Sequence, residues 1–479
     1  MRGFGKTVLA GLSVFICLAC NDGSDSENNL ESDSGSDTGQ ETGSVTGDET
    51  DASTGQTDSE TVTETDSDTV SDSDSVTDSD SDTVFAQWEN LPQAAPNLPV
   101  VDEFSSEGAT ISDAVNRFGL HLFAKLDAEE SGNIFISPFS ISSALAMAWN
   151  GSVAPVEPEM RNVLSYEDLE VPAIQKGYQN LAGGLPGLSD QVILEIANAL
   201  WYRNDIVLRP EYITEATNYF GVYVNQLHGD PLVATQQVNA WVNDKTHGLI
   251  PQIVPANAPF TGDTAAVLAN TVYFKGEWRT KFDSNYTSQK EFTTLSGAVQ
   301  ATMMRRPDAY LPYFENDTLQ MVRLPYKGEE FAMTAVLPKE GASVDDILKT
   351  LDADAWQQWQ IDLQPRSGTV GFPKFKMSYK SMLNTPLIEM GMPTAFDFTS
   401  GWDKMVPDHV MGISRVMHNT SLDINEEGTE AAGATVIEYT DSAAMDPFDI
   451  FFNKPFLVFI HDTETNTILF MGRIEDPTL

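Results

Sequence analysis

The stretch VMHNTSLDINEEGTEAAGAT (residues 416–435) begins like a β-strand and ends in small and acidic residues. Gly428 and Gly433 disfavour a helix over its second half. Gly, Ala and Glu are also depleted in strands. A second strand-like run, IFFNKPFLVFIH (450–461), follows. The second half of the stretch is therefore either a plain connecting loop or a segment that can change conformation.

Residues 1–20 have the pattern of an export signal. Arg2 and a lysine precede the apolar run TVLAGLSVFICLA (7–19), which Cys20 follows. The run is too short for a membrane-spanning helix. Cys20 resembles the lipidated cysteine of a bacterial lipoprotein cleavage box, although Cys17 stands where that box usually has Leu. The alternative is ordinary secretion with cleavage nearby; a multiply acylated Cys20 would anchor the protein stably.

A strongly acidic segment follows the signal. Residues 21–84 hold 20 acidic residues and no Lys, Arg, Pro or aromatic residue. Such a segment cannot bury enough apolar surface to fold. We therefore predict a disordered acidic stalk rich in Ser, Thr and Asp over residues 21–95. The net charge of −44 also argues against nucleic acid and acidic lipid surfaces as partners, so we expect membrane contact only through the lipid anchor.

Residues 96–479 have the composition of one large folded domain. They contain no cysteine, so stability must come from a large core and not from disulfides. Helices come first and strands later, which predicts an α+β fold with large antiparallel sheets. The periodicity predicts helices over 111–126, the second half of 133–151, 235–254, 344–359 and 381–392, and strands over 191–203, 265–278, 319–341 (a hairpin) and 368–380.

The sequence contains no recognisable catalytic or cofactor motif. A G-x-S-x-G elbow, a phosphate loop, a dinucleotide fingerprint and an H-E-x-x-H helix are all missing. The six histidines, at positions 121, 228, 247, 409, 418 and 461, do not have metal-ligand spacing. We therefore expect neither an enzyme, nor a metal, nor a cofactor.

Several motifs, taken in order, resemble the serpins, the serine-protease-inhibitor family, over nearly all of residues 105–479. They are NIFISPFSISSALAM (133–147), ANALW (197–201), LANTVYFKGEW (268–278), LPYKGEEFAMTAVLP (324–338), PKFKM (373–377), LIEMGM (387–392), the opening stretch (416–435), FNKPFLVFI (452–460) and ILFMGRIEDP (468–477). The resemblance implies a monomer with three β-sheets, about nine helices and an exposed reactive-centre loop between Glu426 and Phe452. One departure is the pair of prolines in GSVAPVEPEMRNVL (151–164), which puts the usual cofactor-binding use of this helix in doubt.

In an inhibitory serpin, the target protease cuts the loop and forms an acyl-enzyme, and the severed loop then inserts into a sheet as a new strand. The resemblance places the hinge of this movement at Glu426, Glu427, Gly428, Thr429, Glu430, Ala431, Ala432, Gly433, Ala434 and Thr435. With a period of two, the inward face begins with the small, uncharged residues Thr429, Ala431, Gly433 and Thr435 and continues with Ile437 and Tyr439. Glu430, Ala432, Ala434 and Glu438 share the outward face. Small, uncharged inward residues favour inhibition over the alternative, a non-inhibitory serpin that serves as a binding or scaffold protein.

By the same resemblance, the reactive bond lies between Ser442 and Ala443, or between Ala444 and Met445. Small residues here favour an elastase- or subtilisin-like serine protease over a trypsin-like one. Asp441 would imply an Asp-specific protease if the register slips by one, and a cysteine protease stays open as a target. The protein would be lipid-anchored at a bacterial cell surface or secreted to the extracellular space.

Five further residues match conformational positions of the family. Ser137, Ser140, Asn270 and His418 match a polar cluster beneath the sheet where it parts. Trp201, like Glu426, matches the region where the loop first enters. Without the resemblance, each of the four polar residues would be read as a helix cap or a satisfied core group, and Trp201 as a core aromatic.

Overall fold

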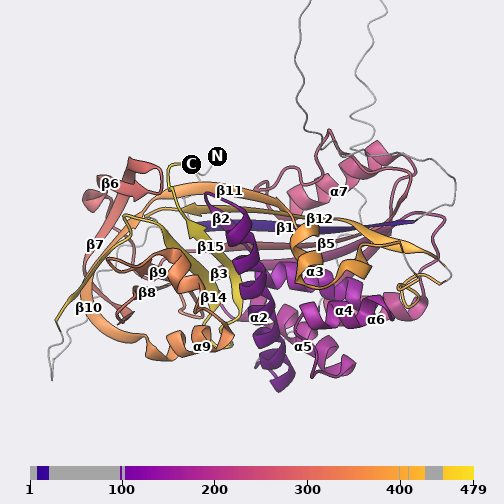
Figure 1. Cartoon of the computed structure of the whole chain (residues 1–479), viewed down its shortest axis with the longest axis horizontal. Helices are drawn as coiled ribbons and strands as arrows, with labels where there is room; N and C mark the ends of the chain where they lie inside the picture. The colour runs from indigo at the N-terminus through magenta and orange to yellow at the C-terminus, as the bar shows by residue number, and fades with distance from the viewer. Residues whose placement is uncertain (1–7, 21–97, 100–102, 399, 408, 427–445) are drawn as a thin grey trace, which may run out of the picture. The chain divides into compact units, whose positions relative to one another are not determined.

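The computed structural model describes residues 8–20, 98–99, 103–398, 400–407, 409–426 and 446–479 (Figure 1). The chain divides into two compact units, residues 1–22 with 92–479 and residues 23–91. Every described residue belongs to the first unit.

A six-stranded sheet forms the widest layer of this unit (Figure 1). Its strands, in spatial order, are β11 (Phe375–Met382), β12 (Met411–Ile424), β1 (Val8–Cys20), β5 (Thr264–Gly276), β3 (Val192–Tyr202) and β4 (Val222–Gln226). All neighbours are antiparallel except β3 and β4. Strand β5 is buried on both faces over nearly its whole length, which explains its mostly apolar sequence, with Asn270 and Thr271 as buried polar residues.

A second hydrogen-bonded network contains nine strands. In order they are β13 (Phe448–Phe451), β10 (Gln364–Pro373), β7 (Gly297–Glu315), β8 (Leu319–Pro325), β9 (Phe331–Pro338), β14 (Phe456–Asp462), β15 (Ile468–Ile474) and β2 (Ile134–Ile136), with β6 (Ser288–Thr294) paired to β7. Strand β7 is 19 residues long and pairs in turn with β6, β10 and β8. The second and third sheets that the resemblance implies are therefore continuous through β7 in the described residues.

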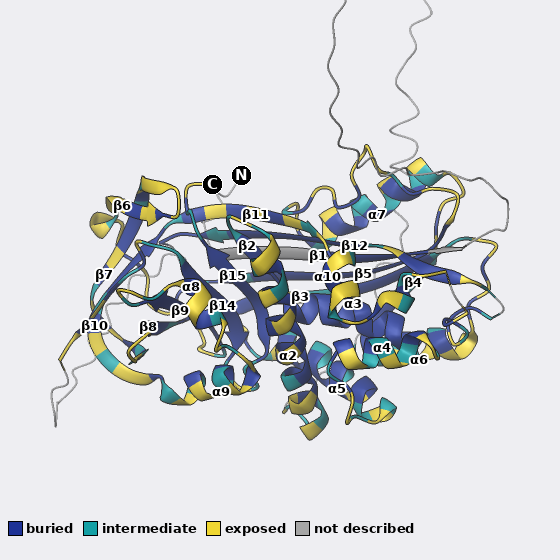
Figure 2. Ribbon diagram, viewed as in Figure 1, coloured by how far each residue is buried: buried dark blue, intermediate teal, exposed yellow. Residues whose placement is uncertain are grey.

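Nine α-helices occur in the described residues, as the resemblance implied. They are α2 (Ser106–Glu129), α3 (Pro138–Asn150), α4 (Val156–Val163), α5 (Val171–Gly184), α6 (Pro210–Phe220), α7 (Pro231–Lys245), α8 (Val344–Leu348), α9 (Ala353–Asp362) and α10 (Asn384–Met390). Helix α3 begins where the sequence predicts, because Ser137 caps it and Pro138 takes its first position. Figure 2 shows α3 buried along its whole length, beneath the six-stranded sheet.

Two predicted elements are each divided in the structure. The single helix predicted over 344–359 is wrong: α8 ends at Leu348, and Asp352 caps a new helix by accepting a hydrogen bond from the Ala355 amide (2.8 Å). The single strand predicted over 368–380 is also wrong. It is divided after Pro373 into β10 and β11, which belong to different sheets. Proline has no N–H to offer a ladder, so it is suited to the end of a strand.

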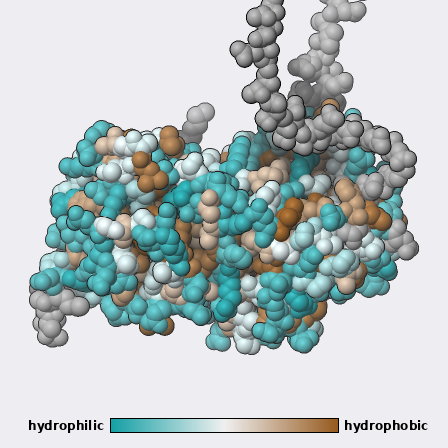
Figure 3. Space-filling view, in the orientation of Figure 1, coloured by the Kyte–Doolittle hydropathy of each residue, from teal (hydrophilic) through white to brown (hydrophobic). Residues whose placement is uncertain are grey.

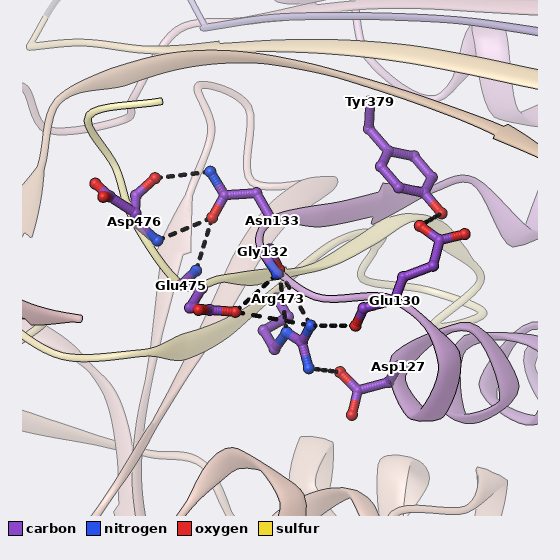
Figure 4. A network of polar contacts seen from close by, with 8 residues as sticks. All are labelled: Asp127, Glu130, Gly132, Asn133, Tyr379, Arg473, Glu475 and Asp476. Carbon is purple, nitrogen blue, oxygen red and sulfur yellow. Dashed lines mark hydrogen bonds and ion pairs between the residues drawn. The ribbon is translucent and has the colours of Figure 1, made fainter. Parts of the chain in front are cut away.

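A buried arginine of the C-terminal strand forms polar contacts with the end of α2 (Figure 4). Arg473 of β15 forms an ion pair with Asp127 (2.5 Å) and donates to the carbonyl of Glu130 (2.9 Å). The Glu130 carboxylate in turn accepts hydrogen bonds from Tyr379 (2.9 Å) and Ser381 (3.0 Å) of β11. One polar network therefore joins the C-terminus, α2 and an edge of the six-stranded sheet.

Candidate functional site: the centre of the six-stranded sheet

Strand β1 occupies the centre of the six-stranded sheet and comes from the extreme N-terminus. It pairs antiparallel with β12 on one side, from Leu9 opposite Asp423 onward, and with β5 on the other. The next described residues lie more than 75 positions further along the chain. The sheet therefore accepts, between β5 and β12, a strand that is remote in sequence from both.

The side chains of β1 enter both layers of the core. Val14, Ile16 and Leu18 belong to the main hydrophobic core that includes α2 and α3. Phe15 and Cys17 belong to a second cluster on the opposite face, which α7 covers (Figure 1). All five side chains are at most 1% exposed. A strand at this position is thus buried on both faces.

The prediction that residues 1–20 are a removable export signal is not tested by this strand. An apolar run is compatible with a signal and with a doubly buried strand, because both lack polar interruptions. A chain cleaved before Cys20 would lack β1, so the two arrangements belong to different forms of the protein. The lipidation of Cys20 and the limits of the stalk also stay predictions, since residues 21–97 lie outside the described residues.

The polar residues Ser137, Ser140, Asn270 and His418 come together beneath the sheet. The Ser137 amide donates to His418 Nε2 (3.3 Å), and the Ser137 hydroxyl accepts from the Ser140 amide. The Ser140 hydroxyl donates to Asn270 Oδ1, and Asn270 Nδ2 donates to Asn198 Oδ1 (2.7 Å). The first turn of α3 thus contacts both strands that flank β1. A role for this cluster in opening the sheet stays a prediction.

His418 is fully buried and only partly satisfied. Burial lowers its pKa to about 3, so the imidazole is neutral at physiological pH. Its Nδ1 has no hydrogen-bond partner in the described structure. A buried polar atom without a hydrogen-bond partner costs folding free energy. His418 is therefore the member of the cluster whose hydrogen bonding is incomplete.

The structure separates Trp201 from Glu426 and corrects the prediction that both lie where the loop enters. Trp201 pairs with Val267 of β5, and the same row of paired residues continues across β1 to Arg415 of β12. Arg415 lies eleven residues before Glu426. At about 3.3 Å per residue this is over 30 Å. Trp201 instead packs on Trp241 of α7, with ring centroids 5.1 Å apart.

The tryptophan that lies beside the end of β12 is Trp278. Its indole nitrogen donates to the carbonyl of Asn425 (3.0 Å), the residue before Glu426. It stacks on Tyr326 with centroids 4.8 Å apart. Sequence reasoning missed this residue although it ends the motif LANTVYFKGEW. The signal was available, because Trp278 follows the end of central strand β5.

Glu426 lies two residues after the end of β12 and is held there by side-chain contacts. Its carboxylate forms an ion pair with Lys374 (2.7 Å) and accepts from the Thr287 hydroxyl (2.9 Å). Burial raises its pKa, but hydrogen bonds from Lys374, its own backbone and Thr287 outweigh that effect and lower the pKa overall. The rest of the predicted hinge and both candidate bonds, Ser442–Ala443 and Ala444–Met445, lie outside the described residues.

The described residues show no arrangement of three or more His, Cys, Asp or Glu side chains able to hold a metal ion. Within the same residues, none of the helices has the length and apolar character needed to cross a membrane. Figure 3 shows polar residues over most of the face in view, with apolar ones in scattered patches.

Comparisons with known proteins agree with this geometry. The model of the family "Serpin (serine protease inhibitor)" matches residues 113–477. Iripin-2 of the tick Ixodes ricinus is 32% identical over 78% of this chain and 94% of its own length. A serpin-like protein of Thermococcus kodakarensis is 34% identical over 77% of this chain and 86% of its own.

Solved structures share the fold. The native thermophilic serpin tengpin superposes with a TM-score of 0.67 at 25% identity, over 79% of this chain and 97% of that one. Human thyroxine-binding globulin, solved with bound thyroxine, gives a TM-score of 0.69 at 24% identity, over 78% and 100%. The family match, the identity to these relatives and the shared fold show that this chain belongs to the serpin family.

Proposed function

We propose that this protein inhibits serine endopeptidases as a suicide substrate. A protease cuts the loop after β12, forms an acyl-enzyme, and is trapped when the severed loop enters the six-stranded sheet. The observation that supports this best is the position between β5 and β12, where the sheet already holds an added strand in β1.

The direction of β1 matches what the loop requires. The loop leaves β12 at Glu426 and must turn back, so it would run antiparallel to β12. Strands β5 and β12 run in the same direction, since both are antiparallel to β1. A returning loop would therefore follow the direction of β1 and begin at the same end, where Leu9 pairs with Asp423. The 16 residues from Glu427 to Ser442 exceed the 13 of β1, so the loop is long enough.

The side-chain pattern of the loop also supports insertion. The inward residues Thr429, Ala431, Gly433 and Thr435 are small and uncharged, while Glu430 and Glu438 lie on the opposite face under strand periodicity. A charge on the inward face would enter a buried layer at a cost of several kcal/mol. This pattern favours inhibition over passive binding.

For the target we propose an elastase- or subtilisin-like protease, since Ser442 and Ala444, the residues before the two candidate bonds, are small and uncharged. For the location we propose export, with Cys20 as a lipid anchor and residues 21–95 as a stalk. The mature inhibitor would then be held at a bacterial cell surface. Labelling with a radioactive fatty acid should mark the wild type but not Cys20→Ser.

The inhibition itself is tested with a chain that begins at Cys20, incubated with elastase, subtilisin, chymotrypsin and trypsin. We expect an adduct with elastase or subtilisin that survives boiling in denaturant. Mass spectrometry of the released peptide identifies the cut bond. Thr429→Arg should abolish the adduct while loop cleavage continues, and Glu430→Arg, on the outward face, should leave the adduct intact. An unchanged adduct with Thr429→Arg would rule out insertion.

A further inference from the structure

A second site lies away from the centre of the sheet, between the segment that follows β5 and the middle of β7. It is a pocket of about 420 Å³, within the size range of small-ligand sites. Its lining comes from two segments: Arg279, Thr280, Lys281, Asp283 and Tyr286 in the first, and Arg305, Arg306, Pro307, Asp308, Ala309 and Tyr310 in the second.

The middle of β7 is irregular at this point. Its pairing with β10 shifts register between Gly368 and Val370, so that Pro307 and Asp308 are left out of the ladder. Asp308 has a positive φ of 55°. Bulges of this kind redirect side chains and are frequent beside binding sites. Here the bulge follows directly after the two arginines, Arg305 and Arg306.

The residues that line the pocket carry an excess of positive charge, whereas the whole chain is strongly negative. Four of the lining residues are cationic and two are acidic, whereas the whole protein has 71 acidic and 27 basic residues. Several of these charged residues have protein partners. Arg279 forms an ion pair with Glu329 (2.6 Å), and Asp283 accepts from the Asn285 amide (2.9 Å). The two cationic residues that adjoin the bulge are Arg305 and Arg306.

Arg306 is the most unusual member. Its side chain is buried, with only 9% of the residue exposed, and no carboxylate among the described residues forms an ion pair with it. One nitrogen donates to the carbonyl of Thr280 (2.5 Å), and the guanidinium lies over the Phe282 ring, 5.3 Å from its centroid. Its Nε and Nη2 have no hydrogen-bond partner in the described structure. Burial and the charge of Arg279 lower its pKa to about 10, which still leaves it charged at pH 7.

A buried guanidinium with two unpaired N–H groups is costly unless something satisfies it. Arginine presents its N–H groups as a planar fork that matches the oxygens of carboxylates and phosphates. We propose that the pocket between the β5–β6 segment and the β7 bulge binds a small oxyanion, with Arg306 as the buried anchor and Arg305 at the rim. The shared chemistry is that of inorganic phosphate, sulfate or a carboxylate group.

The test titrates the full chain with sodium phosphate, sodium sulfate and sodium acetate, each against sodium chloride at equal ionic strength. Thermal unfolding and calorimetry are the measurements. We expect at least one oxyanion to bind saturably and to raise Tm by a few degrees beyond chloride. Preference for phosphate or sulfate over acetate would identify an inorganic ligand, and the reverse a carboxylate ligand. Equal effects of all four salts would overturn the proposal.

Variants locate the site. Arg306→Gln should weaken binding at least tenfold, and Arg305→Gln, on the exposed rim, should weaken it several-fold without loss of folding. Arg323→Gln is the matched control: Arg323 is partly buried and also has a pKa lowered by burial, but it donates to Gln360 and does not line the pocket. Asp308→Asn should leave binding equal or tighter. Unchanged binding in both Arg305→Gln and Arg306→Gln would overturn the assignment.

Discussion

Asn270 of β5 and His418 of β12 are both in register with Val14 of β1, so one strand stands between them. Adjacent strands lie about 4.8 Å apart, which places the two backbones roughly 10 Å from each other. Asn270 is satisfied by Ser140 and Asn198, whereas His418 Nδ1 has no partner in the described structure. The apolar residue Val14 therefore separates the polar side chains of Asn270 and His418 in this row across the sheet.

Removing residues 1–19 should open the position that β1 fills. Under the proposed mechanism, β1 and a cleaved loop of the full-length chain would compete for the same place between β5 and β12. We therefore expect full-length protein to gain little heat resistance when its loop is cut, and the shortened chain to gain much, because only the latter can bury a new strand. The measurement is Tm before and after limited proteolysis of each form.

A point substitution provides an independent check. Val14 is fully buried, so Val14→Asp would place a carboxylate in the core at a cost of several kcal/mol. We expect β1 to leave the sheet and the variant to behave like the shortened chain. Val14→Thr is the control and should behave like wild type. The competition would be refuted if full-length and shortened chains gained the same heat resistance.

The pH dependence of stability should reveal the buried histidines. Burial lowers the pKa of His418, and likewise that of His461, to about 3, against about 6.5 when unfolded. Between pH 6.5 and 3, these two histidines therefore bind protons in the unfolded chain but stay neutral in the folded one. The free energy of unfolding should therefore keep its full histidine contribution above pH 6.5. As the pH drops toward 3, it should fall by up to about 1.4 kcal/mol per pH unit for each histidine.

Urea unfolding between pH 7 and 5 measures this slope, since most carboxylates stay ionised in that range. His418→Asn should remove about half of it, and His461→Asn the other half. A slope unaffected by both buried-site variants would show that other groups carry the pH dependence.

The sequence predicts the parts of this fold in which local signals and burial agree. Ser137-Pro138 marks the start of α3, and the apolar run 265–278 marks β5. The place of β1 was not predictable, since an apolar run alone cannot distinguish an export signal from a doubly buried strand. Trp201 lies near the end of β3 and Trp278 lies two residues after the end of β5, both in family-like motifs, and only the strand register and contacts show which one lies beside Glu426. Strand register depends on long-range pairing, which local patterns do not contain.

Arg473 should contribute strongly to stability because it is a buried charge with several partners. Arg473→Met would leave Asp127, itself half-buried with a pKa raised by burial, without its cation. It would also remove the hydrogen bond to the Glu130 carbonyl. We expect a loss of about 3–5 kcal/mol in the free energy of unfolding. Arg117→Met, which removes an exposed pair with Asp113, should cost less than about 1 kcal/mol. Similar losses in both variants would contradict this account.

The ion pair between Lys374 and Glu426 should stabilise the protein by less than the contacts of Arg473 do. Lys374→Met removes the closest partner of the Glu426 carboxylate, whose side chain is only 12% exposed, and leaves the hydroxyl of Thr287 as its partner. The lysine itself is partly exposed, so we expect a loss of about 1–2 kcal/mol in urea unfolding. Lys376→Met, two residues along on the exposed side of β11, is the control and should change stability by less than about 0.5 kcal/mol. If the two variants were equally stable, Glu426 would be held by Thr287 and the backbone alone.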